Sequence, residues 1–460
     1  MKKIIKPLIF VSVCILFSLA LTSCSGEHTT HKEGDVVIEN EVKATCTTKG
    51  SYDEVIYCSV CDEELSRETK KTDKREHTLL DPVRENDVAP TCVFDGGYDM
   101  VAYCSECGTA AKTVHMTINR YEHQYQGDVC KLCNGSKSSE GLKFELNSDQ
   151  KSYTLVGIGI CKSKDIVIGL HNDLPVTAIG YRAFMNNRNI ETVTFGTENW
   201  IQEFEISAFN GCTKLKEIRL PNSLTTMGID CFMDCRSLQK VTFGNSLKTI
   251  PASAFSNCSS LTEVVFTNSI TVIGGSAFLG CYRLKNITLP SSLLSISSQA
   301  FMQCSIEEIV IPDTVKEIQD KAFGDCRNLK KITLGNSLKT LASTAFYQCY
   351  ALKGVVLPES LERMRSYTFH NCVNLDYIVI PKSVTTIESS TFFLCSTPKL
   401  FYSGSAADWA KISIGTENTD YEKIYYYSNT QPTDKTNSYW RYVDGVPTPW
   451  EISTSSETEG

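Results

Sequence analysis

Hydrophobic and polar residues in the second half of the chain follow one pattern that repeats about every 23 residues. In one copy, Phe255, Cys258 and Leu261 are three residues apart, which places them on one side of a helical or 3₁₀ turn. Val264 and Phe266 then alternate with polar residues, as in a β-strand. No single copy can bury its own apolar side chains, so we expect successive copies to stack.

The cysteine of this pattern recurs in steps of 23 residues, with one step of 22. A leading copy carries Asn187 at the same place. The pattern predicts a mainly β fold with short helical turns, a solenoid of about ten 23-residue coils. The expected column of structural cysteines is Cys212, Cys235, Cys258, Cys281, Cys304, Cys326, Cys349, Cys372 and Cys395.

Such a column has four interpretations. A metal site needs ligands that converge on one point, whereas stacked coils spread their sulfurs along a line with steps of about 4.8 Å. Disulfides need Cβ atoms about 3.8 Å apart and a specific torsion, which parallel stacking does not supply. A reactive thiol needs an exposed, electropositive setting. Packing is favoured, because each cysteine lies between inward-pointing Phe and Leu residues.

A second repeat occupies residues 40–135 and is rich in cysteine. Both of its copies space three cysteines and a histidine by 12, 3 and 16 residues, and a further CxxC pair follows. The residues are Cys46, Cys58, Cys61 and His77 in the first copy, Cys92, Cys104, Cys107 and His123 in the second, and then Cys130 and Cys133. Three cysteines and a histidine with a CxxC pair are typical of a structural zinc site, so each copy is expected to form its own centre.

Two alternatives compete with that grouping. Cys104, Cys107, Cys130 and Cys133 could instead join as in a zinc ribbon. A disulfide framework is the rival to zinc, because exported small modules often rely on disulfides. His115 has no counterpart in the first copy and is interpreted as a surface residue, and His31 is assigned to a polar tether.

The chain begins with a basic segment and a short apolar run that ends in small polar residues, which is typical of an export signal. Its last residues, Leu21-Thr22-Ser23-Cys24, resemble the lipobox of bacterial lipoproteins. The resemblance implies cleavage before Cys24 and attachment of a lipid to its sulfur. The expected location is the cell surface, on the outer face of the cytoplasmic membrane or on the outer membrane.

Charge and motifs narrow the function. The chain has 45 basic and 53 acidic residues and a net charge of −8, without the basic face that nucleic acids require. It contains no HExxH, GxSxG, P-loop or GxGxxG motif in a usable context, so we expect no enzymatic activity and no catalytic cofactor.

One residue of each repeat strand must face outward between two inward positions. These residues form a nearly uncharged column and are the candidate binding face, although β-branched residues also suit strands for their own sake. The column comprises Thr242, Val265, Thr288, Val310, Thr333, Val356 and Val379.

The units AFxxCxxLxxIxLPxSLxxI over residues 173–400 resemble the BspA-like leucine-rich repeats of bacterial surface proteins. The resemblance implies surface display and binding of a protein or glycan, with no catalytic residues. The alternatives are a carbohydrate-binding accessory protein and an extracellular hydrolase with an unrecognised site. The first alternative would use the C-terminal aromatic residues Trp409, Tyr425, Tyr426, Tyr427, Trp440, Tyr442 and Trp450.

The expected domain organisation follows from these segments. It comprises a signal peptide (1–23), a flexible tether (24–39), two cysteine modules (40–84 and 85–135), a linker (136–142), an N-terminal cap (143–172), the repeats (173–400), a C-terminal cap (401–452) and a disordered tail (453–460).

Overall fold

The computed structural model describes residues 31–92, 94–196, 200–418, 421–434 and 436–451. The signal peptide, Cys24 and the C-terminal tail lie outside the described residues. The described chain forms two compact units, the first containing residues up to Pro90 together with 95–119, and the second containing 91–94 together with residues from Arg120 onward.

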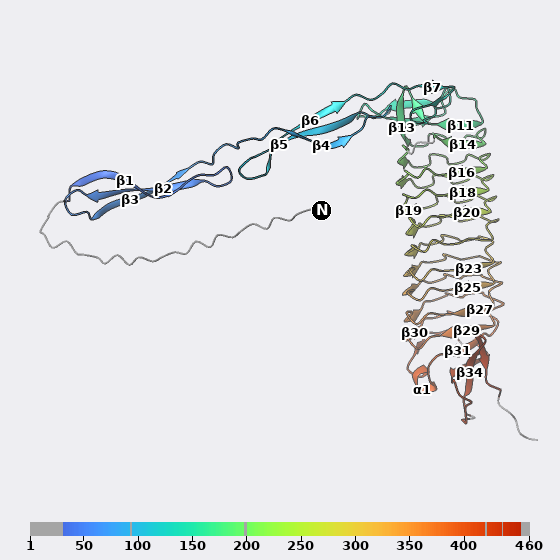
Figure 1. Ribbon diagram of the computed structural model, residues 1–460. Coiled ribbons are helices and arrows are strands. Elements are labelled where there is room, and N and C mark those ends of the chain that lie inside the picture. Colours follow the sequence, from blue (N-terminus) through green and yellow to red (C-terminus); the bar gives the residue numbers. More distant parts are fainter. Residues whose placement is uncertain (1–30, 93, 197–199, 419–420, 435, 452–460) are drawn as a thin grey trace, which may run out of the picture. The chain divides into compact units, whose positions relative to one another are not determined.

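The first unit contains two three-stranded antiparallel sheets, one for each cysteine repeat (Figure 1). The first sheet consists of β1 (Glu33–Val42), β2 (Gly50–Cys58) and β3 (Glu64–Thr72), and the second of β4 (Val83–Val88), β5 (Gly96–Tyr103) and β6 (Ala110–Ile118). The central strand carries the few buried apolar residues, such as Val55 and Val101.

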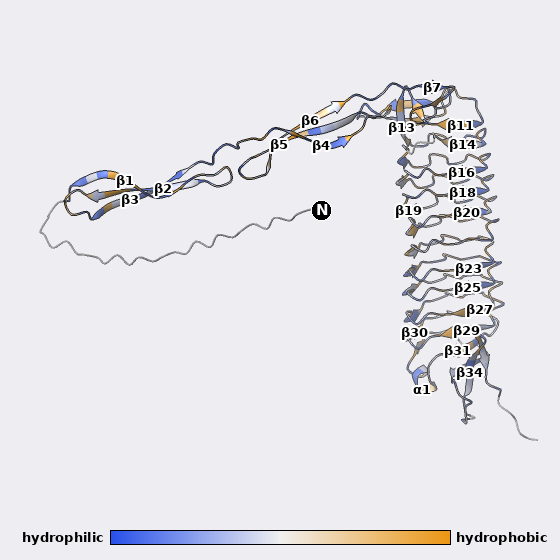
Figure 2. Cartoon of the chain, viewed as in Figure 1, coloured by the Kyte–Doolittle hydropathy of each residue, from blue (hydrophilic) through white to orange (hydrophobic). Residues whose placement is uncertain are grey.

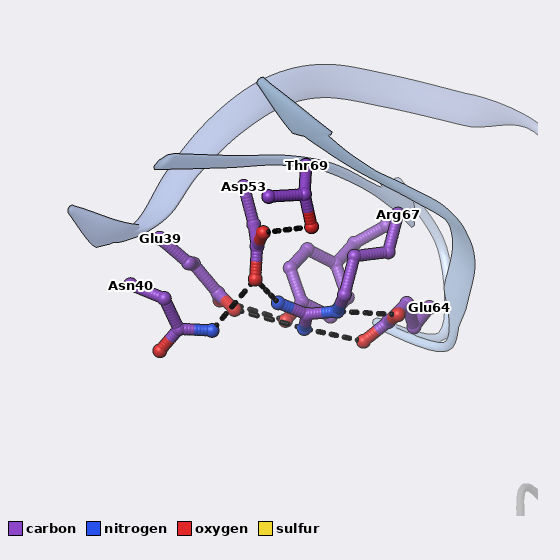
Figure 3. A network of polar contacts seen from close by, with 7 residues as sticks. Glu39, Asn40, Asp53, Glu64, Arg67 and Thr69 are labelled. Carbon is purple, nitrogen blue, oxygen red and sulfur yellow. Dashed lines mark hydrogen bonds and ion pairs between the residues drawn. The ribbon is translucent and has the colours of Figure 1, made fainter. Parts of the chain in front are cut away.

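Polar contacts supplement this small apolar core (Figure 3). The guanidinium of Arg67 on β3 donates to Glu39, Asp53 and Glu64, and so connects all three strands of the first sheet. Asn40 donates to Asp53 at 2.8 Å, and these hydrogen bonds hold the pKa of the Asp53 carboxyl below its usual value. The second sheet repeats part of this network, because Asn86 donates to Asp99.

The second unit is a solenoid whose coils contribute strands to two ladders of mainly parallel strands (Figure 1). The coil that contains Thr288 contributes a strand to only one of them. It begins with the hairpin β7 (Tyr125–Gln126) and β8 (Val129–Cys130) and with the cap strands β9 (Lys143–Leu146), β10 (Tyr153–Gly157) and β12 (Leu170–His171). The first ladder, called the face ladder below, contains β11 (Asp165–Ile168), β14 (Thr192–Phe195), β16 (Glu217–Arg219), β18 (Lys240–Thr242), β20 (Glu263–Val265), β23 (Glu308–Val310), β25 (Lys331–Thr333), β27 (Gly354–Val356), β29 (Tyr377–Ile380), β31 (Lys399–Tyr402), β33 (Lys423–Tyr427), β34 (Ser438–Val443) and β35 (Val446–Pro449). The second ladder contains β13 (Leu174–Ile179), β15 (Glu203–Phe204), β17 (Thr226–Met227), β19 (Thr249–Ile250), β21 (Val272–Ile273), β22 (Ser295–Ile296), β24 (Glu317–Ile318), β26 (Thr340–Leu341), β28 (Arg363–Met364), β30 (Thr386–Ile387) and β32 (Ser413–Ile414).

The register of the ladders places equivalent residues of successive coils beside one another. Val241 pairs with Val264 on the face ladder, and Ile250 pairs with Ile273 on the second ladder. All four side chains are buried, and hydrophobic residues recur on the strands throughout the stack (Figure 2). The solenoid predicted from the repeat is therefore confirmed.

Phenylalanine rings form a continuous stack through the solenoid core. Successive rings from Phe184 to Phe369 lie 5.0–5.8 Å apart between centroids, with interplanar angles of 2–18°. Each of these rings is at least 98% buried, so every coil covers the ring of its neighbour. The stack requires the same side chain at the same place in each coil, which is what the repeat supplies.

The cysteine column lies in the core, and its thiols also donate hydrogen bonds. Each of the nine donates to the carbonyl oxygen of the phenylalanine in the preceding coil, as Cys258 does to Phe232, at 3.0–3.3 Å. Burial raises the pKa of the Cys212 thiol to about 12 and that of the Cys235 thiol well above its ordinary value. A small apolar residue with one weak donor fits this site better than alanine, which has no donor.

The helical part of each coil is a set of hydrogen-bonded turns. Cys258 N–H donates to Phe255 and Leu261 N–H donates to Cys258, which is the spacing expected of a 3₁₀-like turn. Ser253 and Asn257 have positive φ angles of 55° and 60°, and these interrupt a regular helix. Across the described ranges the only helix is α1 (Ala406–Trp409), and none is long and apolar enough to cross a membrane.

The C-terminal cap closes the last coils with aromatic residues. Trp440 on β34 is fully buried, its ring lies 5.3 Å from that of Phe401, and its Nε1–H donates to the Tyr402 carbonyl at 2.9 Å. Val379 packs in the same cluster. Asp444 and Gly445, both at positive φ, then turn the chain into the β34–β35 hairpin.

Two expected domain boundaries are wrong. Residues 33–39, assigned to a tether, belong to strand β1, because the polar sequence there pairs with β2 along its backbone. The expected linker also joins the N-terminal cap, since Ser138 and Ser139 N–H donate to the carbonyls of Leu170 and Val167.

The raised thiol pKa values predict that the solenoid loses stability in alkali. The folded state retains thiol protons that the unfolded chain releases above about pH 8.5, so the free energy of unfolding falls with rising pH, by about 1.4 kcal/mol per pH unit for each such thiol. We expect the urea midpoint, followed by tryptophan fluorescence, to fall between pH 8 and pH 10. All four tryptophans lie in the solenoid and its caps. Cys258→Ala should make the fall shallower, and equal midpoints at both pH values would contradict the prediction.

The buried cap predicts a difference between two aromatic substitutions. Trp440→Ala should lower the free energy of unfolding by about 3–5 kcal/mol, because it removes a fully buried ring and uncovers Val379 and Phe401. Tyr442→Ala should cost much less, since that side chain is 45% exposed. Urea unfolding followed by circular dichroism measures both, and equal costs would show that the cap does not depend on Trp440.

Candidate metal centres and binding face

Cysteines and histidines of the N-terminal repeats gather in three clusters. Within each cluster, one ligand atom per residue lies within 4.8 Å of every other. The first cluster contains His31, Cys58 and Cys61, the second Cys46, His77, Cys104 and Cys107, and the third Cys92, His123, Cys130 and Cys133. All ten residues expected as metal ligands therefore lie in a cluster that could hold a metal ion.

The expected grouping within one copy is wrong. Cys46 and His77 flank one end of the β2–β3 hairpin, whereas Cys58 and Cys61 lie at its turn. A nine-residue strand is about 30 Å long, so the two pairs cannot converge. The second and third clusters instead combine a cysteine and a histidine of one copy with the CxxC pair that follows, and the first combines His31 with the CxxC pair of the first copy. The alternative that joins Cys104 and Cys107 to the last CxxC pair is wrong for the same reason.

The separations within the clusters match those of a tetrahedral metal site. Zinc bonded to sulfur at 2.3 Å and to nitrogen at 2.0 Å places two sulfurs about 3.8 Å apart, and sulfur and nitrogen about 3.5 Å apart. In the second cluster Cys46 Sγ lies 3.7 Å from Cys104 Sγ, and Cys107 Sγ lies 3.5 Å from His77 Nδ1. The third cluster repeats this with 3.7 Å for each of the corresponding pairs.

Backbone amides orient the sulfur at the start of each CxxC pair. Hydrogen bonds from the backbone of Val60 and Cys61, together with one from His31, lower the pKa of the Cys58 thiol to about 6. Cys104 and Cys130 have a pKa of about 6 for related reasons, the CxxC backbone in both cases opposing the effect of burial. Burial has the opposite effect on Cys46 and raises its pKa to about 11. Amide donors to a ligand sulfur are a typical support for metal binding.

The first cluster includes a histidine that the sequence analysis assigned to the tether. His31 Nδ1 lies 3.6 Å from Cys61 Sγ, and its Nε2 lies 3.5 Å from Glu63. The signal for this residue is present in the sequence, because His31, His77 and His123 are spaced 46 residues apart, as the repeats themselves are. His115 is in no cluster. It is exposed and pairs with Asp99 at 2.8 Å.

The candidate binding face follows the face ladder. Val310 is 64% exposed and Val356 is 43% exposed, and Val265, Thr288 and Thr333 are also exposed. Thr242 is half-buried. Val379, expected on this face, is only 2% exposed, because Trp440 and Phe401 cover it from the outside. The open face thus ends before β29.

A groove of about 800 Å³ lies where the open face meets the C-terminal cap. Val310 and Val356 line it on the ladder side, and Tyr442 and Pro447 of the β34–β35 hairpin line the opposite side. Lys331, Asp313 and Glu359 supply charged groups at its rim, and Tyr377 also lines it. Gly354 leaves room for this tyrosine, since a Cβ there would lie 2.3 Å from the ring.

The C-terminal aromatic residues divide into two groups. Trp409 and Trp440 are buried, and Tyr425, Tyr426 and Trp450 are half-buried. Only Tyr427 and Tyr442 are exposed. Most of the ring surface therefore closes the end of the solenoid, and Tyr442 is the aromatic that reaches the groove.

Comparison with solved structures finds similar leucine-rich repeat proteins. A leucine rich cell surface protein from Faecalibacterium prausnitzii is 23% identical, with 61% of this chain and 97% of that chain covered and a TM-score of 0.37. The T. pallidum leucine rich repeat protein is 27% identical over 46% of this chain and 89% of that chain, with a TM-score of 0.37. A leucine-rich repeat protein from Bacteroides ovatus is 19% identical, with 62% and 98% covered and a TM-score of 0.35. No curated protein matches the chain.

The family model for the BspA type leucine rich repeat region matches six copies, over residues 177–304 and 294–409. These residues make up half of the chain and coincide with the stacked coils of the two ladders. The chain therefore belongs to the BspA-type leucine-rich repeat family.

Proposed function

We propose that this protein is a lipid-anchored bacterial surface protein that binds an extracellular protein or glycan along the open face of its solenoid. The observation that carries the proposal is the exposed, nearly uncharged column that leads into the groove beside the C-terminal cap. The cysteine modules serve as a spacer in this proposal. Membership of a repeat family whose solenoids present extended surfaces supports it.

The side chains of the open face are suited to binding a ligand. Valine and threonine side chains lose little conformational entropy when they are covered, because branching at Cβ already restricts them. The neighbouring outward column carries charges, and Lys240 pairs with Glu263 at 2.7 Å across adjacent coils. An apolar centre with a polar, charged edge is the usual arrangement of a protein interface.

The groove adds a site of different character. Its side chains combine apolar surface from Val310 and Val356 with an aromatic ring and hydroxyl from Tyr442. The Tyr442 hydroxyl can donate at neutral pH, as any tyrosine of ordinary pKa can, and burial raises its pKa further. Aromatic rings beside hydrogen-bonding groups are compatible with a peptide or a sugar, and the binding experiment below separates the two.

Charge substitutions on the open face test the proposal. Val310→Lys with Val356→Lys should weaken binding at least tenfold, because a lysine ammonium must be desolvated where a valine is now buried by the ligand. Binding is measured on immobilised extracellular-matrix proteins and on a glycan array. Thr249→Lys is the matched control, an exposed β-branched residue on the second ladder. Equal loss in the control, or no loss in the double variant, would remove the open face as the binding site.

The lipid anchor is tested at Cys24. Wild-type protein should partition into the detergent phase of a Triton X-114 extraction, because two acyl chains give stable anchoring. Cys24→Ala should leave the cells or partition into the aqueous phase. Equal partitioning of both proteins would contradict the lipid anchor. It would not bear on the proposed binding face.

A further inference from the structure

We propose that the second and third clusters each bind one Zn²⁺ ion as a closed Cys₃His centre, and that the ion of the third cluster belongs to the N-terminal cap of the solenoid. All four residues of the second cluster lie in the first unit, and all four of the third lie in the second unit. The inference goes beyond the proposed function, because it involves neither the open face nor the groove.

Convergence of the side chains favours a metal ion over disulfides. Sulfurs joined in a disulfide lie about 2.05 Å apart. Cys46 and Cys104 are 3.7 Å apart at Sγ, and the corresponding sulfurs of the third cluster have the same separation. A disulfide would join two of the three sulfurs and leave the third sulfur and the imidazole beside it without a role. One zinc ion accounts for all four groups, whose ligand atoms lie within 4.8 Å of one another in each cluster.

The turn of each CxxC pair places its sulfurs for metal binding. The Cys130 carbonyl accepts a hydrogen bond from Asn134 N–H at 2.8 Å, which closes a tight turn around the pair. Asn134 has a positive φ angle of 57°, and Gly108, at the same place in the second cluster, has one of 69°. Gly135 N–H donates to Cys133 Sγ at 3.4 Å, and such an amide donor supports a thiolate that binds a metal.

The third cluster packs into the start of the solenoid. Cys133 and Tyr125 pack against the buried side chains of Leu170 and Trp200. Gly135 leaves the space for this contact, because a Cβ at that position would lie 2.7 Å from the Trp200 ring and 3.1 Å from Cys133 Sγ. One ligand sulfur is therefore part of the apolar packing of the N-terminal cap.

The two clusters differ in exposure. His77 of the second cluster is exposed, whereas the four residues of the third are buried or half-buried. The ring of His123 stacks on that of Tyr125, with 5.4 Å between the centroids. An ion at the third cluster would connect Cys92, which precedes β5, to the CxxC pair that follows β6. Such a connection between distant segments stabilises the folded cap, because it restricts the chain and the binding energy is available only in the folded state.

Zinc content of the purified full chain tests both centres. The wild-type chain should contain at least two zinc ions, measured by mass spectrometry of the metals. Cys104→Ser with Cys107→Ser should contain one ion fewer, and so should Cys130→Ser with Cys133→Ser. Cys161→Ser is the control, because it replaces a half-buried cysteine outside the clusters, and it should retain the wild-type content.

Two outcomes of this experiment would overturn the proposal. One is an unchanged zinc content in either double variant. The other is a zinc-free wild-type chain whose intact mass rises on reduction by two hydrogen atoms for each cysteine pair, because the cysteines would then form disulfides. The wild-type measurement decides between zinc and disulfides even if a double variant fails to fold.

Tryptophan emission tests the place of the third ion. Trp200 lies beside the third cluster, and the other three tryptophans lie in the C-terminal cap. The chain loaded with Co²⁺ should show weaker emission than the chain loaded with Zn²⁺, because thiolate-bound Co²⁺ absorbs near the wavelengths at which tryptophan emits. The difference should disappear in Trp200→Phe and in Cys130→Ser with Cys133→Ser. It should persist in Cys104→Ser with Cys107→Ser. Equal emission of the two wild-type forms, with metal bound, would overturn the assignment of the third ion to the cap.

Discussion

Coil-on-coil stacking is the interaction on which the solenoid depends. Each coil alone would leave its phenylalanine, cysteine and leucine exposed, and the neighbouring coil buries all three. The stack also satisfies polar groups, since every thiol in the column donates to a carbonyl of the preceding coil. Packing and hydrogen bonding thus impose the same register. A substitution that disturbs the core packing also disturbs the hydrogen bonds, and this explains why so few residue types occupy these positions.

The ends of the stack show what happens where this interaction stops. The last coils have no following repeat, and aromatic side chains of the C-terminal cap take its place. Trp440 covers the outer surface of the last strands as well as the end, so the cap also limits the length of the open face. One segment therefore protects the core and forms a wall of the groove.

Sequence periodicity predicted the solenoid well, because inward residues such as Phe255 and Cys258 recur at fixed intervals and the interactions are between neighbours. The outward column was predicted by the same alternation, and Val265 and Val310 are exposed as expected. Val379 was not predictable in this way. Its burial comes from a tryptophan 61 residues further along the chain, outside the repeat. A periodic pattern contains no information about a segment that folds back on it.

The clustered cysteines and histidines show a second limit of prediction from sequence. Residue types and spacing identified ten of the eleven clustered residues, but proximity in sequence suggested the wrong partners. The length of strand β2 decides the grouping. The extended strand places Cys46 and Cys58 near its opposite ends, too far apart to contact the same ion.

The offset between the cysteine repeats and the clusters has a consequence for the addition of further copies. Because the second and third clusters each take two residues from one copy and two from the next CxxC pair, each of them lies where one copy meets the next. Adding one whole 46-residue copy would add three cysteines and a histidine, which is one more set of the kind found in the second and third clusters. The number of copies can thus change in whole steps, and each step brings its own set of four clustered side chains.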